Sequence, residues 1–342
     1  MDGWVHRRKM RWWILFLTIG LLFAYLFGGF AIRVLSNFWY HDFYDPVDIC
    51  GALAAGKTGR PSWIPRDSFV IDMHAHTTAS DGLLTPRQLV CWEIANGYDG
   101  VVVSDHNTMV SVESCKQAAA ELDPDFLVIP GMEFTALNVH MNLVGIKTPG
   151  VVPNMLWTRR KTIKRAIDHA HSEGGVVQFN HPDWYFFNAF KKYPRDWWME
   201  QDIDGWEVYN GFGFFDEDAL NFIENHRDIK TMYASAGTDV HDPAKHFRCY
   251  TEILTKDRTQ EGVLAALKAG KTKVHLHVDQ ERERVPPERG KIHVSAERQE
   301  FIRKWKWIYW VGDALIMGNR RKLLVGLLAS IILFSIFLAM FT

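Results

Sequence analysis

The sequence is poor in cysteine and has no excess of either charge. Its 342 residues include 4 cysteines, with 39 lysines and arginines against 40 aspartates and glutamates. The cysteines lack the short paired spacing of a zinc ribbon or a small disulfide scaffold, and they do not decide the redox compartment. A formal net charge of -1 lacks the basic bias of a dedicated nucleic-acid binder, so we expect no nucleic acid among its partners.

Two other patterns are missing. No serine of the central region lies in a G-x-S-x-G nucleophile elbow, so the sequence does not indicate a serine hydrolase. No repeat of solenoid length is visible either. The hydrophobic fraction of 47% is too high for a disordered chain. We therefore expect a folded protein with a core large enough to hold buried polar groups.

Long uncharged runs, in contrast, occur at both ends. Residues 12–32 and 323–342 carry no charged side chain, and each run is long enough to cross a bilayer as a helix. Tryptophans and tyrosines gather beside both runs, as they do at membrane interfaces. We predict transmembrane helices over 12–35 and 323–342, and hence an integral membrane protein with the lipid bilayer as a partner. A cleaved signal peptide is the alternative for the first run, but its apolar stretch is longer than usual.

The basic residues beside these helices predict two different orientations. The N-terminal tail carries Arg7, Arg8, Lys9 and Arg11, whereas more lysines and arginines flank the helices on their other side. The larger number favours a cytoplasmic central domain, but the first helix usually dominates, which favours the outside. We predict an extracytoplasmic domain and leave the cytoplasmic alternative open.

The composition divides the chain into seven parts. They are a basic tail (1–11), a transmembrane helix (12–35), a connector (36–68), the soluble domain (69–279), a charged linker (280–304), an aromatic and basic segment (305–322) and a second transmembrane helix (323–342). The linker has charges of both signs and few apolar residues, which is typical of a solvated segment. The segment 305–322 fits either an interfacial helix or the base of the last span.

The soluble domain alternates short apolar runs with amphipathic ones. Strands are expected over 69–71, 100–103, 126–130, 176–179, 205–209 and 231–236, and helices over 86–96, 112–121, 163–170, 216–225 and 261–269. Strands that alternate with helices favour parallel strands joined by crossover helices. The pattern therefore predicts an α/β fold, closed as a barrel or open as a layered sheet.

Histidines and carboxylates follow the predicted strands. His74 and His76 end the first strand and can face the same object, because alternate strand residues share a face. Later runs end in similar side chains, namely Asp105 with His106, Glu133, His181, and Asp239 with His241. Such groups are costly to bury unless they are paired or bound to metal, and the carboxyl ends of strands in β/α folds open on one cavity. Imidazoles and carboxylates without cysteine suit zinc, manganese or iron(II).

In chain order, these motifs closely resemble those of the PHP superfamily of metal-dependent phosphoesterases, named after polymerase and histidinol phosphatase. The motifs are Asp72–Gly82, Ser104–His106, Gly131–Glu133, His140–Asn142, Asn180–Pro182 and Gly237–His241, and the resemblance covers about 69–278. It implies a distorted (β/α)7 barrel that binds two or three divalent ions, Zn, Mn or Fe. Asn142 stands where several phosphoesterase relatives have a histidine, and in this the chain is more similar to the carbaryl-hydrolase-like branch.

The resemblance also implies a role for each ligand position. It places His74, His76, Glu133 and Asp239 around a first metal, with Glu133 bridging to a second metal held by His140 and His181, and with Asp81, His106 and His241 around a third. Asp72 and Asp105 are expected to orient histidines rather than to bind metal. We expect Glu133, Asp239 and His181 to be the catalytic residues.

The resulting hypothesis is a membrane-anchored metal-dependent hydrolase. It would cleave a small anionic phosphate ester with a metal-activated hydroxide, so no protein nucleophile is needed. An amide or carbamate metallohydrolase of the same superfamily is the rival within the same chemistry. A membrane module that binds metal or a ligand without turnover is a further alternative.

Other polar features are expected to lie outside the site. The basic run 159–165 and the pair His169 and His171 favour a solvated surface, and His275 and His277 favour a structural role. Two candidates remain near the site. Lys245 and Arg248 could bind an oxyanion, and residues 184–187 fit either a pocket wall or core packing.

Overall fold

The computed structural model describes residues 20, 50, 60–61, 64–136, 139–153, 158–182, 193–241 and 249–275. All of them except Gly20 belong to one compact unit of the chain. The soluble domain predicted over 69–279 contains most of these residues, and the other predicted parts lie largely outside them. The predicted boundaries of those parts stay predictions.

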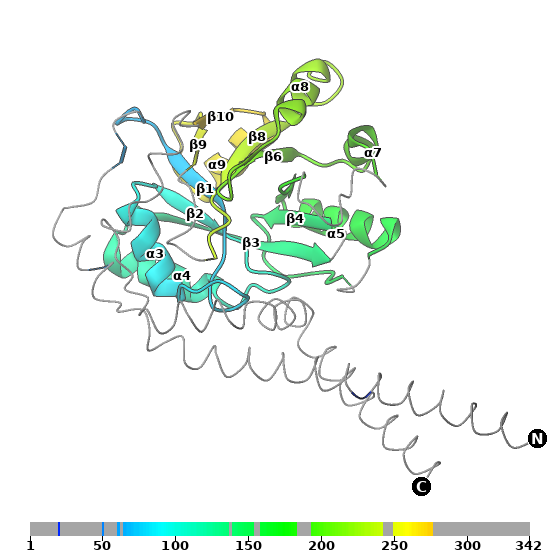
Figure 1. The fold of residues 1–342 in the computed structure, drawn as a ribbon. Helices are drawn as coiled ribbons and strands as arrows, with labels where there is room; N and C mark the ends of the chain where they lie inside the picture. The colour runs from blue at the N-terminus through cyan, green and yellow to red at the C-terminus, as the bar shows by residue number, and fades with distance from the viewer. Residues whose placement is uncertain are drawn as a thin grey trace, which may run out of the picture. The chain divides into compact units, whose positions relative to one another are not determined.

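Seven of the ten strands in the described residues form a nearly closed mixed barrel (Figure 1). In chain order they are β1 (Val70–Ala75), β2 (Gly100–Val103), β3 (Leu127–Ala136), β4 (Val139–Val144), β5 (Val176–Phe179), β6 (Gly205–Asn210) and β8 (Tyr233–Gly237). Neighbouring strands are parallel, except that β4 is antiparallel to both β3 and β5. The ring closes where β8 meets β1, because Ala75 and Val240 form a β-bridge and the Asp239 amide donates to the His74 carbonyl at 2.7 Å.

The remaining strands extend the sheet outside this ring. They are β7 (Phe214–Phe215), which pairs antiparallel with β6, β9 (Tyr250–Ile253), which pairs antiparallel with β1, and β10 (Thr272–His275), which pairs antiparallel with β9. β1 therefore contacts β2, β8 and β9, and its polar residues lie where the first and last strands of the ring meet.

Helices pack against the outside of the barrel (Figure 1). They are α3 (Pro86–Ala95), α4 (Val112–Leu122), α5 (Arg160–Ser172), α7 (Arg195–Glu200), α8 (Glu217–Asn225) and α9 (Gln260–Lys268). α3 begins at a capping box, in which the Thr85 hydroxyl accepts from the Gln88 amide while the Gln88 side chain accepts from the Thr85 amide. Pro86 at the first helical position lacks only an N–H that the helix does not use.

The alternation of side chains along β1 separates core from site. Ile71 and Met73 belong to a buried apolar cluster that also contains Val102. Asp72 and His74 are also fully buried, but they have different neighbours, because the register of β1 shifts between Asp72 and Ala75. Asp72 lies against Glu93 of α3, whereas His74 joins the other predicted ligands.

The predicted α/β architecture is confirmed in this coarse form, with one correction. The sequence analysis predicted a helix as the next element after the strand at 126–130, but β4 follows β3 after only two residues. A connection that short cannot hold a crossover helix, so the two strands pair antiparallel. The sequence analysis also does not predict α7, β7, β9 or β10, which are short elements.

The prediction of an integral membrane protein with an extracytoplasmic domain is contradicted. Across the described ranges, no helix is both long enough and apolar enough to cross a bilayer. Among the described helices the longest is α5, with 13 residues and several basic side chains. The two predicted spans, 12–35 and 323–342, lie outside the described residues. An uncharged run of sufficient length permits a span but does not require one.

A disulfide joins Cys50 to Cys91, and the spacing of the cysteines did not indicate it. The two residues are 41 positions apart, and Cys91 lies in α3. The other cysteines, Cys115 and Cys249, are buried free thiols. The disulfide ties the segment that precedes the barrel to its first helix.

Candidate metal centre

All nine side chains predicted as metal ligands converge in one region at the strand ends. They form four overlapping groups whose donor atoms lie within 4.8 Å of one another: His76, Asp81, His106 and His241; His74, Glu133 and His181; His74, His76 and Asp239; and His106, Glu133 and His140. Four residues belong to two groups each, namely His74, His76, His106 and Glu133, so the groups form one continuous cluster. The cluster is almost entirely buried.

One group is built on β1 and β8. The Nε2 atoms of His74 and His76 lie 3.3 Å and 3.1 Å from the same oxygen, Asp239 Oδ1. The two ring nitrogens are also 3.0 Å from each other. Two imidazole nitrogens that point at one carboxylate oxygen, and at each other, form the donor arrangement of a cation site.

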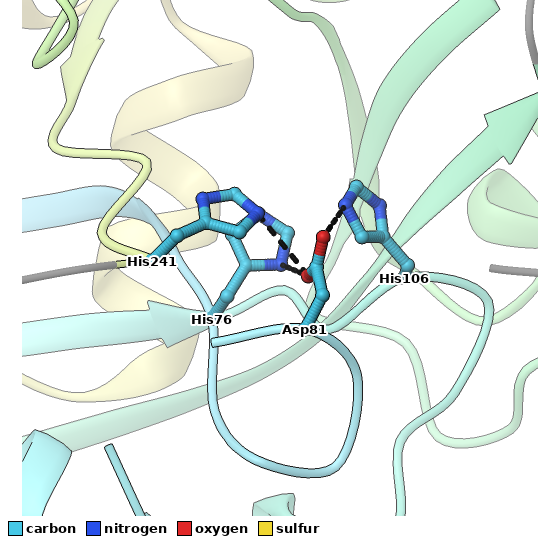
Figure 2. Close-up of side chains that lie close together, drawn as sticks. All are labelled: His76, Asp81, His106 and His241. Atoms are coloured by element: carbon cyan, nitrogen blue, oxygen red, sulfur yellow. Dashed lines mark ion pairs between the residues drawn. The ribbon is translucent and has the colours of Figure 1, made fainter. Parts of the chain in front are cut away.

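A second group surrounds Asp81, in the loop after β1 (Figure 2). Asp81 Oδ1 lies 3.1 Å from His241 Nε2, and Asp81 Oδ2 lies 3.4 Å from His106 Nε2. His76 faces the same carboxylate through its Nδ1 atom, at 3.9 Å. His76 thus presents one ring nitrogen to each of the two groups.

Glu133, on β3, lies between the remaining histidines. Its Oε2 atom is 2.5 Å from His106 Nδ1, and its Oε1 atom is 3.1 Å from His140 Nδ1. Oε1 also lies 3.4 Å from both His74 Nε2 and His181 Nε2. The two oxygens of one carboxylate therefore serve separate sets of imidazoles, which is the geometry of a bridging ligand.

Two of these ligands occupy unusual backbone conformations. His181 has a φ of 23° and Asp239 a φ of 52°, in the left-handed region that residues with a Cβ rarely adopt. Each follows the end of a strand, so the turn of the backbone redirects the side chain into the cluster. Backbone strain of this kind is concentrated at functional sites, where surrounding contacts hold it in place.

Glu207, on β6, contacts two of the predicted ligands, and the sequence analysis did not single it out. Its Oε1 atom lies 2.9 Å from His74 Nδ1, and its Oε2 atom accepts a hydrogen bond from the His181 amide at 2.8 Å. A carboxylate on the second nitrogen of a ligating histidine fixes the tautomer and the ring orientation. The signal in the sequence is an acidic residue within the otherwise apolar run Gly205–Tyr209.

Asp72 and Asp105 act on amide and hydroxyl groups near the predicted ligands. Neither contacts an imidazole ring: Asp72 accepts from the Thr238 amide and hydroxyl, and Asp105 accepts from the side chains of Thr77 and Ser80. Asp72 thereby joins the β8 end to β1, and Asp105 fixes the loop that carries Asp81. Asp72 also accepts from the His74 amide at 3.1 Å, and Ser80, which donates to Asp105, lies 3.5 Å from His76 Nδ1. Both carboxylates therefore act on the segments that carry predicted ligands and not on the imidazole rings themselves.

A second buried carboxyl lies against Asp72. Burial raises the pKa of Asp72 to about 6, despite its hydrogen bonds with Thr238. Burial and the neighbouring charge of Asp72 raise the pKa of Glu93 well above its usual range. Glu93 is therefore held protonated beneath β1, and it lies outside the group of predicted ligands.

Asn142 is a buried hydrogen-bonding residue. Its Nδ2 atom donates to the Met73 carbonyl at 3.0 Å, and its Oδ1 atom accepts from Asn180 Nδ2 at 2.9 Å. Asn180 also donates to Glu133 Oε1 at 2.8 Å. The amide at position 142 thus supports the cluster through Asn180 instead of entering it.

The carboxylates of the cluster stay ionised despite their burial. Burial alone would raise the pKa of Glu133, but the neighbouring imidazoles, first His140 and then His106, bring it well below its usual range. The pKa of Asp239 is lowered in the same way, chiefly by His74. Negative charge is therefore concentrated where the ring nitrogens meet.

The histidines divide into two electrostatic classes. Burial opposes protonation of His74, but the carboxylates around it, led by Asp239, raise its pKa to about 10. His241 behaves likewise, with Asp81 raising its pKa to about 9. For His76, burial and the adjacent histidines lower the pKa to about 3, so this ring is neutral at pH 7.

The residues fit a divalent cation. Asp81 Oδ1 and Asp239 Oδ1 are buried and have no hydrogen-bond partner. Each lies 3.1 Å from an imidazole nitrogen, that of His241 or His76, without the alignment of a hydrogen bond. Buried carboxylate oxygens are almost always satisfied, so two that lack a partner among histidines indicate where a bound cation belongs.

The other predicted features lie apart from the cluster. His171 pairs with Asp204 at 2.7 Å, and His275 pairs with Glu252 at 2.7 Å. Within the basic run 159–165, Lys164 pairs with Asp168 on the helix surface. Four predictions fall on residues outside the described ranges, namely those for residues 184–187, Lys245, Arg248 and His277.

No protein family profile matches the sequence. Parts of the chain are similar to 5'-3' exoribonucleases, with 31% identity over 90 residues to Rnm of Salmonella typhimurium and 36% identity over 105 residues to an enzyme of Haemophilus influenzae. These matches cover 26% and 28% of this chain, and 31% and 37% of the relatives. The chain thus matches about a third of the length of these relatives.

Several solved structures are similar to parts of the chain at low identity. A two-domain protein of Bacteroides vulgatus, with a predicted PHP-like metal-dependent phosphoesterase, shares 22% identity, with a TM-score of 0.49 over 61% of this chain and 65% of that chain. A putative metal-dependent phosphoesterase of Bifidobacterium adolescentis shares 19% identity, with a TM-score of 0.40 over 50% and 87%. The lesion-specific endonuclease of Pyrococcus furiosus shares 16% identity, with a TM-score of 0.43 over 61% and 58%.

Proposed function

We propose that this chain is a metal-dependent phosphoesterase of the PHP type. The observation that carries the proposal is the pair of buried, unpartnered oxygens of Asp81 and Asp239 inside a ring of imidazoles. In the metal-free chain protonated His74 and His241 balance these carboxylates, and bound cations would take the place of those protons. The local similarity to exoribonucleases supports hydrolysis of a phosphate ester.

The nine side chains divide naturally between two or three divalent ions, Zn, Mn or Fe. Asp239 with His74 and His76 would hold one ion, Glu133 would extend to a second with His140 and His181, and Asp81 would hold a third with His106 and His241. When bound, such ions supply an activated water and neutralise charge on the phosphoryl group. His76, neutral at pH 7, is available as a donor without losing a proton.

The chain's own residues orient this set and exclude water from most of it. The Glu207 carboxylate contacts Nδ1 of the His74 ring and accepts a hydrogen bond from the backbone amide of His181. Two proposed ligands are therefore held by one side chain. Glu133, Asp239 and His181 are the residues we propose to be closest to the reacting ester. His181 Nε2 lies 3.4 Å from Glu133 and 3.9 Å from Asp239, which places all three around one point.

The proposed substrate is a small anionic phosphate ester. The exoribonuclease relatives favour a second candidate, an RNA phosphodiester, although the sequence analysis expects no nucleic acid. A balanced net charge gives no strong long-range attraction for a polyanion. We therefore rank the small ester first and include RNA in the test.

The test combines metal analysis with an activity panel. The full chain is loaded with Mn, Zn or Fe, and bound metal is measured per chain. The panel contains a phosphomonoester, a phosphodiester, a 5'-phosphorylated oligoribonucleotide, an amide and a carbamate. We expect turnover of at least one phosphate ester. The variants His76→Ala and Asp239→Ala should lose at least about 100-fold in turnover, since replacing a residue that only hydrogen-bonds to a metal ligand already costs 10–100-fold.

The matched control is His226→Gln, which removes an imidazole that contacts the Phe222 carbonyl away from the cluster. This variant should keep both metal content and turnover. Turnover of RNA alone would favour the second candidate. A chain that binds the metal but cleaves none of the phosphate esters would contradict the proposal, and cleavage of only the amide or carbamate would assign a different bond to the same centre.

A further inference from the structure

Phe212 is an exposed aromatic side chain beside the proposed metal centre. It lies in the turn between β6 and β7, and 42% of its surface is exposed. The centre of its ring is 6.1 Å from that of His241, with the two planes tilted by 46°. An aromatic face next to a polar, charged centre is the combination typical of small-molecule sites, in which polar groups fix the ligand and apolar side chains line the pocket.

The turn that carries Phe212 is fixed to the centre. Asn210 Nδ2 donates to Glu207 Oε2 at 3.0 Å and to Asp239 Oδ2 at 3.1 Å, while its Oδ1 atom accepts from the Phe212 amide at 3.0 Å. Gly211 packs against β8 so closely that a Cβ there would lie 2.2 Å from the Thr238 carbonyl oxygen. The position of Phe212 is therefore tied to Asp239, a proposed ligand, and to Glu207, which holds two other proposed ligands.

The exposure of the proposed ligands shows from which side a substrate approaches. The side chains of His241 and His140 are 22% and 15% exposed, whereas the other seven are 6% exposed or less. Solvent reaches the cluster through these two rings. Phe212 stands next to the more exposed of them, at the entrance to the cluster.

We propose that Phe212 contacts the substrate and selects esters that carry a planar ring. This inference rests on the proposed phosphoesterase function and specifies its substrate class. A ring attached to a phosphoryl group at the cluster would lie over the Phe212 face, at the centroid distance of about 4.5–7 Å that stacked rings adopt. An aliphatic group of equal size would bury similar apolar area but would lack the stacking contribution.

The test compares two substrates that differ in planarity alone. Benzyl phosphate and cyclohexylmethyl phosphate have leaving alcohols of similar size and reactivity, so the ratio of their kcat/KM values measures recognition of the ring. We expect the metal-loaded chain to prefer benzyl phosphate. Phe212→Ala should lower this ratio by about 2- to 10-fold, the range that corresponds to an aromatic pair. Phe212→Leu should lower the ratio similarly, whereas Phe212→Trp, which keeps an aromatic ring, should keep the ratio close to that of the wild type.

Phe215→Ala is the matched control. Phe215 lies on β7, three residues away, is similarly exposed at 45%, and has no contact with the proposed ligands. This variant should keep the wild-type ratio. The metal content of every variant is measured alongside, so that a change in the ratio at full metal occupancy reports on the substrate contact.

The two proposals fail in different ways. If the wild-type chain cleaves both esters but Phe212→Ala leaves their ratio unchanged, or Phe215→Ala changes it equally, the role of Phe212 is refuted while the phosphoesterase stands. If the metal-loaded wild-type chain cleaves neither these esters nor any phosphate ester of the larger panel, the phosphoesterase and the inference drawn from it are both refuted.

Discussion

At the scale of single residues, the centre depends on which atom of each histidine is free to bind. His74 directs Nε2 into the cluster because Glu207 occupies Nδ1 at 2.9 Å. The same glutamate accepts from the His181 amide, so it orders two proposed ligands at once. Glu207 is thus a positioning residue. Its substitution should weaken metal binding more than it lowers the stability of the fold.

We predict that Glu207→Gln lowers metal affinity by about 10–100-fold, the usual cost of losing a carboxylate behind a ligating histidine. Metal titration of the purified chain measures this directly. The control is Glu252→Gln, which breaks an equally short contact with His275 outside the cluster and should leave the affinity unchanged. Equal effects of the two changes would contradict an orienting role for Glu207.

The residue scale also shows what the sequence can predict. All nine proposed ligands were predicted because each sits in a short motif with fixed spacing after a strand, and the chain brings them together. Glu207 was missed because it belongs to no motif and is a single acidic residue within a mostly apolar strand. The hydrogen-bond partners of Asp72 and Asp105, which are amides and hydroxyls, were not predicted, because they depend on which donors the loops bring near, and spacing along the chain does not specify that.

At the scale of elements, the junction of β1 and β8 is the most constrained part of the site. Gly237 ends β8, and a Cβ at this position would lie 2.3 Å from His74 Cβ and 2.8 Å from Glu207 Oε1. No side chain fits between the two strands there. The approach of β8 to β1 that brings Asp239 to His74 therefore requires glycine.

We predict that Gly237→Ala forces β8 away from β1, lowering the free energy of unfolding by about 1–3 kcal/mol through overpacking and weakening metal binding. Denaturant unfolding and metal titration measure the two effects. Gly174→Ala is the control. Its Cβ would meet no atom within 4 Å, so it should cost about 1 kcal/mol for its left-handed backbone and leave metal binding intact. Unchanged metal affinity in Gly237→Ala would refute the argument.

Elements were predicted unevenly for a physical reason. The parallel strands and long helices have clear periodic patterns, and β2 and β5 were predicted with the observed bounds. β4 was missed because its residues Val139–Val144 read as a histidine motif, and because β3 and β4 lie too close for the expected helix. β9 and β10 are as short as β2 and β5, but their sequences YTEI and TKVH lack the mostly apolar run that identified those two strands.

At the scale of the whole molecule, the cluster couples stability to pH. The pKa values of His74 and His241 are raised to about 10 and about 9, from 6.5. A histidine whose pKa is raised by folding stabilises the folded chain fully below the unfolded pKa, and this stabilisation is lost as pH rises through the folded pKa. The metal-free chain should therefore lose stability between pH 7 and 9.

We predict a fall on the order of 1 kcal/mol per pH unit for each of these histidines in the metal-free chain. In the metal-loaded chain the rings bind cations in place of protons, so the free energy of unfolding should change little over the same range. Thermal unfolding at pH 7.0, 8.0 and 8.5, with chelator and with metal, measures both slopes. Parallel slopes in the two states would show that these imidazoles do not exchange protons for cations.

The closure of the barrel by its first and last strands also sets when the centre can form during synthesis. His74 and Asp239 meet at the β1–β8 junction, yet they are separated by most of the domain, and the bridge that joins them is between Ala75 and Val240. A ribosome adding about 5–20 residues per second releases the two halves of the site many seconds apart. A nascent chain that ends before β8 lacks Asp239 and His241, so the two donor groups that contain these residues can form only after translation has passed the last strand of the ring.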